Sequence, residues 1–328
     1  MSKPKVFVSR IIAEKALEKL SAAAGIEVWQ DELPPPYEIL TEKVRDIEGL
    51  LSLLTDRVDA PLMDAAPKLK VISNLAVGYD NIDIPEATKR GIPVGNTPEV
   101  LTETTADLAF ALLMAAARRI VEADTFTRRG LWKTWGPGLM MGQDIHHATL
   151  GIIGLGRIGK EMARRARGFD MKVIYYSRTQ APAVIERELE LKRVSTLDKL
   201  LAEADFISIN VPLNENTHYL IGERELDMMK PTAVLVNTSR GPVIDQKALY
   251  NALKSGKVFA AGLDVTEVEP IPQDDPLLTL DNVIILPHIG SGSIATREKM
   301  GLMAVDNIIA GLRGEPLPNC VNQEVQQR

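Results

Sequence analysis

Side chains with acid–base or ion-pairing chemistry follow three apolar runs in the second half of the chain. Arg240 follows AVLVNTS, Glu267 and Glu269 follow AAGLDV, and His288 follows VIILP. Near-continuous apolar runs of this kind fit parallel strands that are covered on both faces. In open α/β sheets, ligands bind outside the carboxyl ends of the strands. The sequence therefore predicts that an arginine, a pair of glutamates and a histidine converge on one ligand-binding edge of a sheet.

These residue types together suit the reduction of a carbonyl group. His288 can donate a proton near neutral pH, and Glu269 can accept the other ring N–H and so fix the tautomer. Arg240 offers a planar fork that binds a carboxylate and polarises a carbonyl oxygen. Taken singly, each is as well explained as a surface or loop residue. Their joint position at strand ends favours a catalytic set.

The other three histidines lack such a position. His146 and His147 precede a strand, and His218 lies in the loop NENTHYL. Solvated or capping roles are expected for all three, and the proposed chemistry needs no metal.

A glycine-rich loop stands before these strand ends. Gly154-Leu155-Gly156-Arg157-Ile158-Gly159 matches G-x-G-x-x-G, with the run LGII before it and a helical run after it. Within a strand–loop–helix unit, the glycines permit a tight turn, a close approach of the backbone to a pyrophosphate, and close packing of the helix on the strand. We therefore expect a dinucleotide bound at the start of the helix.

The strand after this helix bears on the choice of dinucleotide. NAD-binding versions carry an acidic residue near the end of this strand for the ribose 2′-hydroxyl. This chain reads Tyr176-Ser177-Arg178-Thr179 instead. An arginine here can bind a 2′-phosphate through charge-assisted hydrogen bonds worth roughly 1.5–3 kcal/mol, about 10- to 150-fold in affinity. The sequence favours NADP(H) over NAD(H), and a solvated Arg178 is the alternative.

Both halves of the chain alternate short strands with helices, which predicts right-handed βαβ units and doubly wound parallel sheets. In the first half, five strands are expected, at Val6–Ser9, Ile26–Trp29, Gly49–Leu54, Val71–Ala76 and Pro93–Gly95. In the second half, six are expected, at Leu150–Ile153, Lys172–Tyr176, Asp205–Asn210, Ala233–Asn237, Ala260–Val265 and Val283–Leu286. The helices of the first half are expected at Ile11–Ala23, Glu38–Asp46, Pro61–Ala66 and Pro85–Arg90.

Three further segments stand apart from this alternation. Asp107–Arg119 is apolar all round, which predicts a helix buried on most faces. Arg128–Asp144 is irregular and holds two of the three tryptophans, which is typical of a subunit contact or a domain junction. Ile294–Leu312 is expected to form a final amphipathic helix.

Composition bounds the class of protein. The 328 residues fit about two domains, and 45% hydrophobic with 25% charged residues is typical of folded globular chains. A net charge of −6 argues against nucleic-acid binding, and a single cysteine, Cys320, excludes an internal disulfide framework. The apolar run in MSKPKVFVSR is too short for a signal sequence, and no run approaches a membrane span. A soluble, cytoplasmic protein is expected.

Long stretches of the chain resemble the D-isomer-specific 2-hydroxyacid dehydrogenases. GIIGLGRIGK, INVPLNENTHYLI, LVNTSRGPVID, AGLDVTEVEP and ILPHIGS carry the resemblance through the second half, and NLAVGYDNID and TADLAFALLMAAAR extend it into the first. Within the family the chain is most similar to glyoxylate/hydroxypyruvate reductases, partly through YYSRT. The resemblance implies NADPH-dependent reduction of glyoxylate to glycolate and of hydroxypyruvate to D-glycerate.

The resemblance also implies roles for individual residues. Arg240, Glu269 and His288 are implied to be catalytic, with Arg240 and His288 touching both cofactor and substrate. Implied cofactor contacts beyond the glycine loop and the strand end Ser177-Arg178-Thr179 are Thr105, Val211, Pro212, Thr217, Thr238, Ser239, Asp264 and Gly290, with Asp264 on the nicotinamide amide. Implied substrate contacts are Leu53 and the backbone around Val77-Gly78, with Trp135 from a neighbouring subunit.

The architecture implied by the resemblance has two Rossmann-like domains. A flavodoxin-like substrate domain of residues 1–99 and 290–328 receives a cofactor domain of residues 100–289. Such proteins form homodimers through the cofactor domain, which favours a subunit contact at Trp132–Trp135.

Other functions on the same scaffold stay open. One is another D-2-hydroxyacid dehydrogenase, of the D-lactate or 3-phosphoglycerate type. The first type usually carries the ribose-binding acid that is absent here, and 328 residues leave no room for the regulatory domain of many of the second. Phosphite oxidisers carry a lysine where this chain has Val77. A corepressor that senses a dinucleotide could retain the arginine, glutamate and histidine, and it would bind cofactor without turnover.

Overall fold

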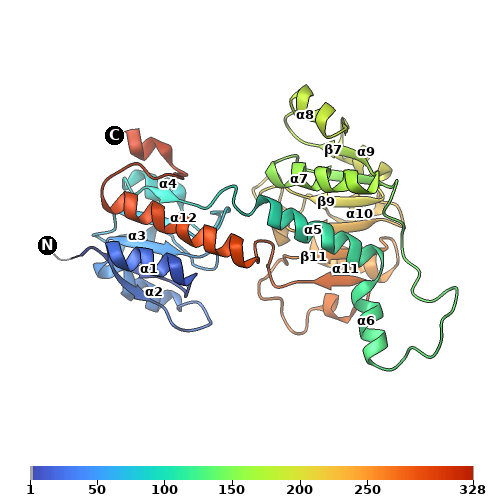
Figure 1. Ribbon diagram of the computed structural model, residues 1–328, viewed down its shortest axis with the longest axis horizontal. Helices are drawn as coiled ribbons and strands as arrows, with labels where there is room; N and C mark the ends of the chain where they lie inside the picture. The colour runs from blue at the N-terminus through green and yellow to red at the C-terminus, as the bar shows by residue number, and fades with distance from the viewer. Residues whose placement is uncertain (1–2, 328) are drawn as a thin grey trace. The chain divides into compact units, whose positions relative to one another are not determined.

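A computed structural model describes residues 3–327 of the chain. The chain forms two compact units, Met1–Leu101 with Ser291–Arg328, and Thr102–Gly290 (Figure 1). The domain boundaries expected from the sequence differ from these by one or two residues. We refer to the two as the discontinuous unit and the inserted unit.

The discontinuous unit is built on a five-stranded parallel sheet. Its strands are β1 (Lys5–Val8), β2 (Gly25–Val28), β3 (Gly49–Ser52), β4 (Val71–Asn74) and β5 (Val94–Gly95). Their order in the sheet is β2-β1-β3-β4-β5, and every neighbouring pair runs parallel. This is the flavodoxin-like order, so the predicted fold class is confirmed for this unit.

Helices cover both faces of this sheet, and each layer has its own apolar core. One face packs against α1 (Glu14–Ala23) and α12 (Ile294–Leu312), and the other against α2 (Tyr37–Lys43), α3 (Ala60–Asp64) and α4 (Ile84–Lys89). The end of the chain is fastened here by Asn322, which accepts a hydrogen bond from the Val94 amide (2.8 Å) and donates one to the Ile92 carbonyl (3.0 Å). The C-terminal segment thereby completes a domain begun by the first hundred residues.

The inserted unit is built on a seven-stranded parallel sheet. Its strands are β6 (Thr149–Ile153), β7 (Lys172–Tyr176), β8 (Leu191–Arg193), β9 (Phe206–Ile209), β10 (Val234–Asn237), β11 (Ala260–Leu263) and β12 (Val283–Ile285). Their order is β12-β11-β10-β9-β6-β7-β8, a doubly wound sheet that reverses direction at β6. The prediction of six strands was wrong by one. The missed strand, β8, has three residues and only Leu191 is buried, so it shows no apolar run.

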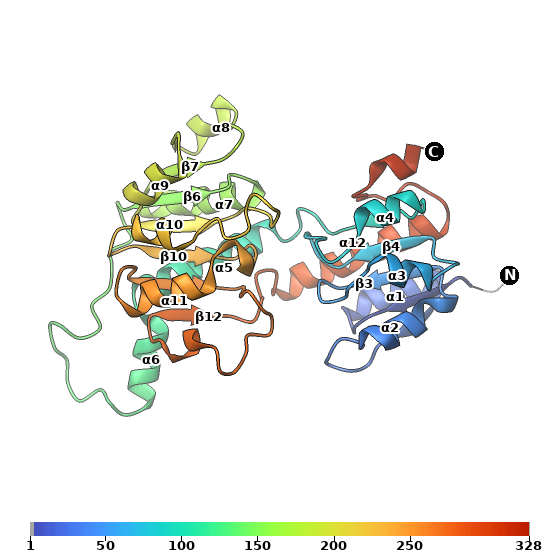
Figure 2. The same ribbon diagram turned by 180° about the vertical axis from the view of Figure 1, so that it is seen from behind.

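Two helical layers enclose this sheet (Figures 1 and 2). On one face α5 (Thr102–Ala117) packs beside α7 (Arg157–Ala166), and on the other lie α9 (Leu197–Glu203), α10 (Glu223–Asp227) and α11 (Gln246–Lys254). The prediction that this helix is buried on most faces was wrong: the buried residues of α5, such as Ala106, Phe110 and Leu113, lie on one side of the helix, and Asp107 and Ala111 are exposed. The expected helix Asp107–Arg119 starts five residues earlier than predicted, at Thr102, and stops before Arg119, whose φ is 52°.

The remaining elements are short or exposed. They are α6 (Ile120–Arg128), which buries none of its residues, α8 (Ala183–Glu188), and the 3-10 turns Val44–Asp46, Arg167–Phe169, Gly241–Val243, Pro276–Thr279 and Gln323–Gln327. Within residues 3–327, no helix combines the length and apolar character needed to cross a bilayer.

Candidate active site

The glycine-rich loop connects β6 to α7 at the point where the strand order reverses. β6 lies between β9 on one side and β7 on the other, so the loops after β6 and β9 leave in opposite directions. Such a switch point is where open α/β sheets form a crevice for ligands. The six loop residues predicted to bind a dinucleotide therefore lie where that prediction requires.

The glycines of this loop have distinct geometries. Gly154 has φ +89°, and a Cβ there would lie 2.7 Å from the Asn210 carbonyl oxygen. A Cβ on Gly159 would lie 2.5 Å from the Gly154 carbonyl oxygen, so only glycine allows this close packing of helix on loop. Gly156 caps the first turn of α7, and a Cβ there would meet nothing within 4 Å. An open glycine at a helix N-terminus leaves backbone amides accessible to a pyrophosphate, so the loop fits a dinucleotide.

The segment after β7 carries the residues predicted to select the cofactor. Ser177 is half-buried, and Arg178 and Thr179 are exposed. Arg193, at the carboxyl end of β8, donates from Nη2 to the carbonyl oxygens of Ser177 (3.2 Å) and Arg178 (3.5 Å). Arg193 was missed at the sequence level because its strand was missed.

His288 and Glu269 form a hydrogen-bonded side-chain pair at the predicted catalytic edge. The His288 Nδ1 lies 2.7 Å from the Glu269 Oε2, and both side chains are partly exposed, at 26% and 34%. The other carboxylate oxygen of Glu269 accepts a hydrogen bond from the Thr266 amide (3.2 Å). A carboxylate can only accept from the ring, so Nδ1 carries the proton in this pair and Nε2 is the nitrogen that faces other partners.

The second glutamate of the same loop has a different environment. Glu267 accepts a hydrogen bond from the Gln246 amide (3.3 Å), and its hydrogen bond to Tyr219 raises the pKa of that phenol. The structure thus ties Glu267 to the start of α11 and leaves Glu269 as the partner of the histidine.

Asp264 fixes the backbone that carries His288. Its buried carboxylate accepts hydrogen bonds from the Ile289 and Gly290 amides, both at 2.7 Å, and its carbonyl oxygen accepts from the His288 amide (3.0 Å). Burial raises the pKa of this carboxyl group despite the two amides. The contacts hold His288 at φ +53°, a left-handed backbone conformation that costs energy outside glycine.

Arg240 follows β10 and lies on a loop packed against the loop of Glu269. A Cβ on the next residue, Gly241, would lie 1.8 Å from the Thr266 carbonyl oxygen, so the two backbones are in direct contact. The Arg240 carbonyl accepts a hydrogen bond from the Asn237 side chain (2.9 Å), and its Nη1 donates to the Ser239 carbonyl (2.9 Å). The ends of β10, β11 and β12 thus bring the three predicted catalytic residues to one edge.

The other predicted cofactor contacts lie around the same edge. The Val211 side chain abuts Gly154, and Pro212 and Thr217 close a turn through a hydrogen bond of 2.6 Å. Thr238 and Ser239 follow β10, where the Ser239 hydroxyl donates to the Asn237 side chain (2.7 Å). Thr105 lies on α5 and is 4% exposed beside the buried Gly290. Their roles toward a cofactor stay predictions.

The predicted substrate residues of the discontinuous unit lie on two cross-linked loops. The buried Asn74, at the end of β4, donates to the Gly78 carbonyl and to the Asn81 side chain, both at 3.0 Å. Asn81 in turn donates to the carbonyl oxygens of Leu53 (3.0 Å) and Asp56 (2.9 Å). The Val77–Gly78 backbone and Leu53 are therefore held by one amide network. Sequence reasoning missed it, although a polar residue at a strand end was its signal.

Trp135 and the three remaining histidines lie on the surface of the inserted unit. Trp135 is 77% exposed in the irregular segment after α6. His146 and His147 are exposed and contact each other edge to face, and His218 stacks on Tyr219 with ring centroids 4.0 Å apart.

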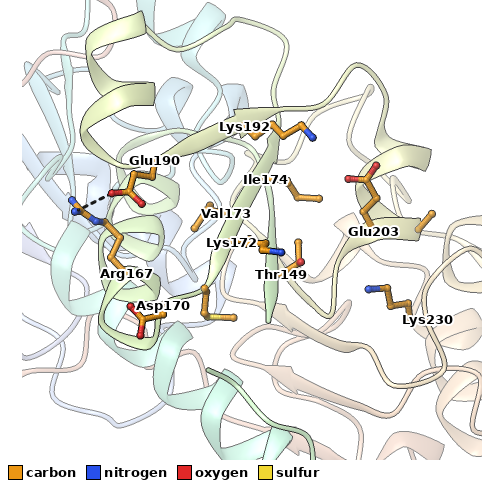
Figure 3. Close-up of a pocket in the computed structure, with 12 residues that line it drawn as sticks. Thr149, Arg167, Asp170, Lys172, Val173, Ile174, Glu190, Lys192, Glu203 and Lys230 are labelled. Atoms are coloured by element: carbon orange, nitrogen blue, oxygen red, sulfur yellow. Dashed lines mark hydrogen bonds and ion pairs between the residues drawn. The ribbon is translucent and has the colours of Figure 1, made fainter. Parts of the chain in front are cut away.

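A cavity of about 870 Å³ lies at the opposite edge of the same sheet (Figure 3). It begins at Thr149 and Lys172, the first residues of β6 and β7, and its charged lining includes Lys192, Glu203 and Lys230. Strand direction therefore separates this cavity from the glycine loop and the catalytic residues.

Comparison with known proteins agrees with this arrangement. Residues 110–290 match the family model of the D-isomer specific 2-hydroxyacid dehydrogenase NAD binding domain. A glyoxylate reductase of Korarchaeum cryptofilum is 56% identical over 324 residues, covering 98% of this chain and 97% of that protein.

Solved structures agree as well. The crystal structure of the TT0316 protein of Thermus thermophilus superposes with a TM-score of 0.91 at 45% identity, covering 97% of this chain and 99% of that one. An NADPH-dependent glyoxylate/hydroxypyruvate reductase of Sinorhizobium meliloti, solved with NADP and malonate, has a TM-score of 0.86 at 34% identity, covering 98% and 97%. The chain therefore belongs to the D-isomer specific 2-hydroxyacid dehydrogenase family of oxidoreductases.

Proposed function

We propose that the protein is an NADPH-dependent reductase of glyoxylate to glycolate and of hydroxypyruvate to D-glycerate. The names of the relatives from Korarchaeum and Sinorhizobium support this substrate class. The observation that carries the proposal is the His288–Glu269 pair, with Nδ1 and Oε2 2.7 Å apart, at the edge of the sheet that holds the glycine loop.

In the proposed mechanism, the glycine loop Gly154–Gly159 and the segment Ser177–Thr179 would hold NADPH, which would supply a hydride for the keto carbon. His288 donates the Nε2 proton to the keto oxygen, so that the C=O bond becomes a C–H and an O–H bond. Glu269 accepts the Nδ1–H and stabilises the imidazolium that precedes donation. Arg240 binds the substrate carboxylate and supports the charge that develops on oxygen.

The substrate carboxylate also needs hydrogen-bond donors. The backbone around Val77–Gly78 is proposed to supply them. The Asn74 side chain holds this loop by donating to the Gly78 carbonyl oxygen, and this contact does not use the backbone N–H groups of the loop. Backbone amides bind carboxylates without requiring a second buried charge.

Preference for NADPH is proposed from the end of β7. The segment Ser177-Arg178-Thr179 offers two hydroxyl groups and an exposed guanidinium, and it lacks the acid that would repel a 2′-phosphate. Charge-assisted hydrogen bonds of this kind are worth roughly 1.5–3 kcal/mol.

A homodimer is proposed through the inserted unit. Leu131, Trp132, Trp135 and Met141 are 49%, 60%, 77% and 66% exposed, and the adjacent helix α6 buries none of its residues. An apolar surface with aromatic residues of this kind is typical of a subunit interface. A partner subunit's use of Trp135 near the substrate is part of this proposal.

The test of the proposed function is a cofactor-oxidation assay with glyoxylate, hydroxypyruvate, pyruvate and phenylpyruvate, each with NADPH and NADH. Glyoxylate and hydroxypyruvate are expected to give the highest kcat/KM, and NADPH the lower KM. A dominant bulky keto acid contradicts the substrate class, and a preference for NADH contradicts the cofactor. Cofactor binding without turnover of any keto acid favours a sensing role instead.

A further inference from the structure

We propose that Arg193 is a second phosphate-binding arginine, which together with Arg178 discriminates a 2′-phosphorylated adenosine from an unphosphorylated one. This inference rests on the proposed preference for NADPH. It assigns part of that preference to a residue outside the segment β6–glycine loop–α7–β7.

The sheet places Arg193 at the correct edge. β8 pairs with β7 in parallel, and Arg193 stands beside Tyr175 in the register. Because parallel strands end at the same edge, Arg193 at the end of β8 lies next to the segment that follows β7. That segment, Ser177–Thr179, is where the doubly wound fold holds the ribose 2′ position.

The guanidinium of Arg193 already contacts that segment. One nitrogen, Nη2, bridges the carbonyl oxygens of Ser177 and Arg178 at 3.2 and 3.5 Å. Among residues 3–327, no carboxylate pairs with Arg193, and no protein acceptor binds its Nε or Nη1. A planar guanidinium anchored through one nitrogen keeps its remaining N–H groups for a ligand.

The acidic groups nearest in sequence are engaged elsewhere. Glu186 accepts a hydrogen bond from the Tyr175 hydroxyl (2.5 Å), Glu188 pairs with Arg164 (3.2 Å), and Glu190 lies 3.5 Å from Arg167. These contacts leave the positive charge of Arg193 unbalanced by its neighbours.

The chemistry matches a phosphate monoester. A 2′-phosphate carries close to two negative charges near neutral pH and several strong acceptor oxygens. Two guanidinium groups suit such a ligand better than one, because each can donate in a fork. Arg178 is exposed, and among the described residues it has no carboxylate partner either.

Lys192 supplies a matched control. It precedes Arg193 on the same strand, so its side chain points to the other face of the sheet, and it lines the cavity at the opposite edge (Figure 3). Lys192→Gln and Arg193→Gln remove the same charge one residue apart.

The experiment measures binding of adenosine 2′,5′-bisphosphate and of adenosine 5′-monophosphate to the full-length protein by calorimetry. Arg193→Gln is expected to weaken binding of the bisphosphate about tenfold and that of the monophosphate less than twofold, and Lys192→Gln to change neither by more than twofold. Thermal unfolding of each variant reports whether the fold is kept.

The remaining outcomes separate this inference from the proposed function. If the wild-type protein binds the bisphosphate no more tightly than the monophosphate, the preference for NADPH is wrong. If the wild type prefers the bisphosphate and Arg193→Gln keeps that preference, Arg193 is not a phosphate ligand. Equal weakening of both nucleotides by Arg193→Gln also overturns the inference, because Arg193 then only supports the loop.

Discussion

The two sheets are both doubly wound and parallel, but their carboxyl edges are built differently. At the edge of the inserted unit, the His288–Glu269 pair is about one-quarter to one-third exposed, and Arg240 is half-buried. At the edge of the discontinuous unit, the side chains of Ser52 and Asn74 are buried and bind each other at 3.1 Å. The first edge keeps its ionisable pair accessible, and the second buries the polar side chains that fix its backbone.

From this difference we infer different tasks for the two edges. Proton transfer requires side chains that reach a substrate, so they stay partly exposed. Recognition by backbone requires loops of fixed shape, and an amide side chain can satisfy several carbonyl oxygens at once. We therefore expect substitutions at the first edge to act on kcat and those at the second to act on KM and stability.

The largest effect is expected at Arg240. Arg240→Ala removes the fork for the substrate carboxylate and the support for charge on the carbonyl oxygen, so kcat should fall at least about a hundredfold. Steady-state kinetics with glyoxylate and NADPH measure this effect. Arg187→Ala, an exposed arginine on α8, serves as a control for lost charge and should leave kcat within twofold. Near-normal turnover of Arg240→Ala removes this residue from the mechanism.

A smaller effect on the same edge is expected at Glu269. Glu269→Gln keeps the size of the side chain and removes the carboxylate that faces the Nδ1 of His288. Loss of the carboxylate partner of a metal-binding histidine costs about 10- to 100-fold, and by analogy a fall of this size in kcat is expected here, with little change in KM. The pH dependence of kcat should change as well. A variant with an unchanged kcat and pH profile would show that the pair is only structural.

At the edge of the discontinuous unit, Asn74→Ala leaves the Gly78 carbonyl without its side-chain donor. Loosening of the Val77–Gly78 loop should raise KM for glyoxylate about tenfold, and loss of buried hydrogen bonds should cost about 1–3 kcal/mol in the free energy of unfolding. Ser73→Ala, on the adjacent position of β4, is the control for KM. A fall in kcat with KM unchanged contradicts the division of tasks between the edges.

The smallest effect is expected at Asp56, which lies in the same network. Its Oδ2 accepts hydrogen bonds from the Ser9 hydroxyl and from the Leu53 amide (2.7 Å), and its buried Oδ1 has no partner among the described residues. Burial raises the pKa of this carboxyl group. Because the folded pKa lies above the unfolded one, its contribution to stability is present at low pH and is lost as the pH rises through the folded pKa.

Asp56→Asn removes this ionisation and keeps an acceptor oxygen. The variant should exceed the wild type by about 1 kcal/mol in the free energy of unfolding at pH 8, and the gain should shrink toward pH 4. Urea unfolding at both values measures it. A variant that is equally destabilised at pH 4 and pH 8 contradicts a cost of burying the charge.

The residues at the edge of the inserted unit were predicted from the sequence more fully than those at the edge of the discontinuous unit. Arg240, Glu269 and His288 follow strongly apolar strands, and their residue types indicate their chemistry without knowledge of contacts. Asn74 stands at a strand end, which was a signal, but the carbonyl oxygens that Asn74 and Asn81 bind, those of Gly78 and Leu53, cannot be read from the residue types. Glu269 was chosen over Glu267 at the sequence level, and the structure gives them different partners, the His288 ring for Glu269 and the Gln246 amide for Glu267.

Short strands set the other limit. β8 has a single buried residue and no alternating pattern, so it was not recognised. Arg193 was lost with it, because its relevance comes entirely from the pairing of β8 with β7.

His288 is proposed to donate the proton that accompanies hydride transfer. The direct test is stopped-flow single turnover of NADPH with saturating glyoxylate, for the wild type and for His288→Ala, with NADPH binding measured separately by fluorescence. If His288 is the proton donor, His288→Ala should bind NADPH within about threefold of the wild type and transfer hydride at least about a hundredfold more slowly. Hydride transfer at a near wild-type rate in His288→Ala would contradict it.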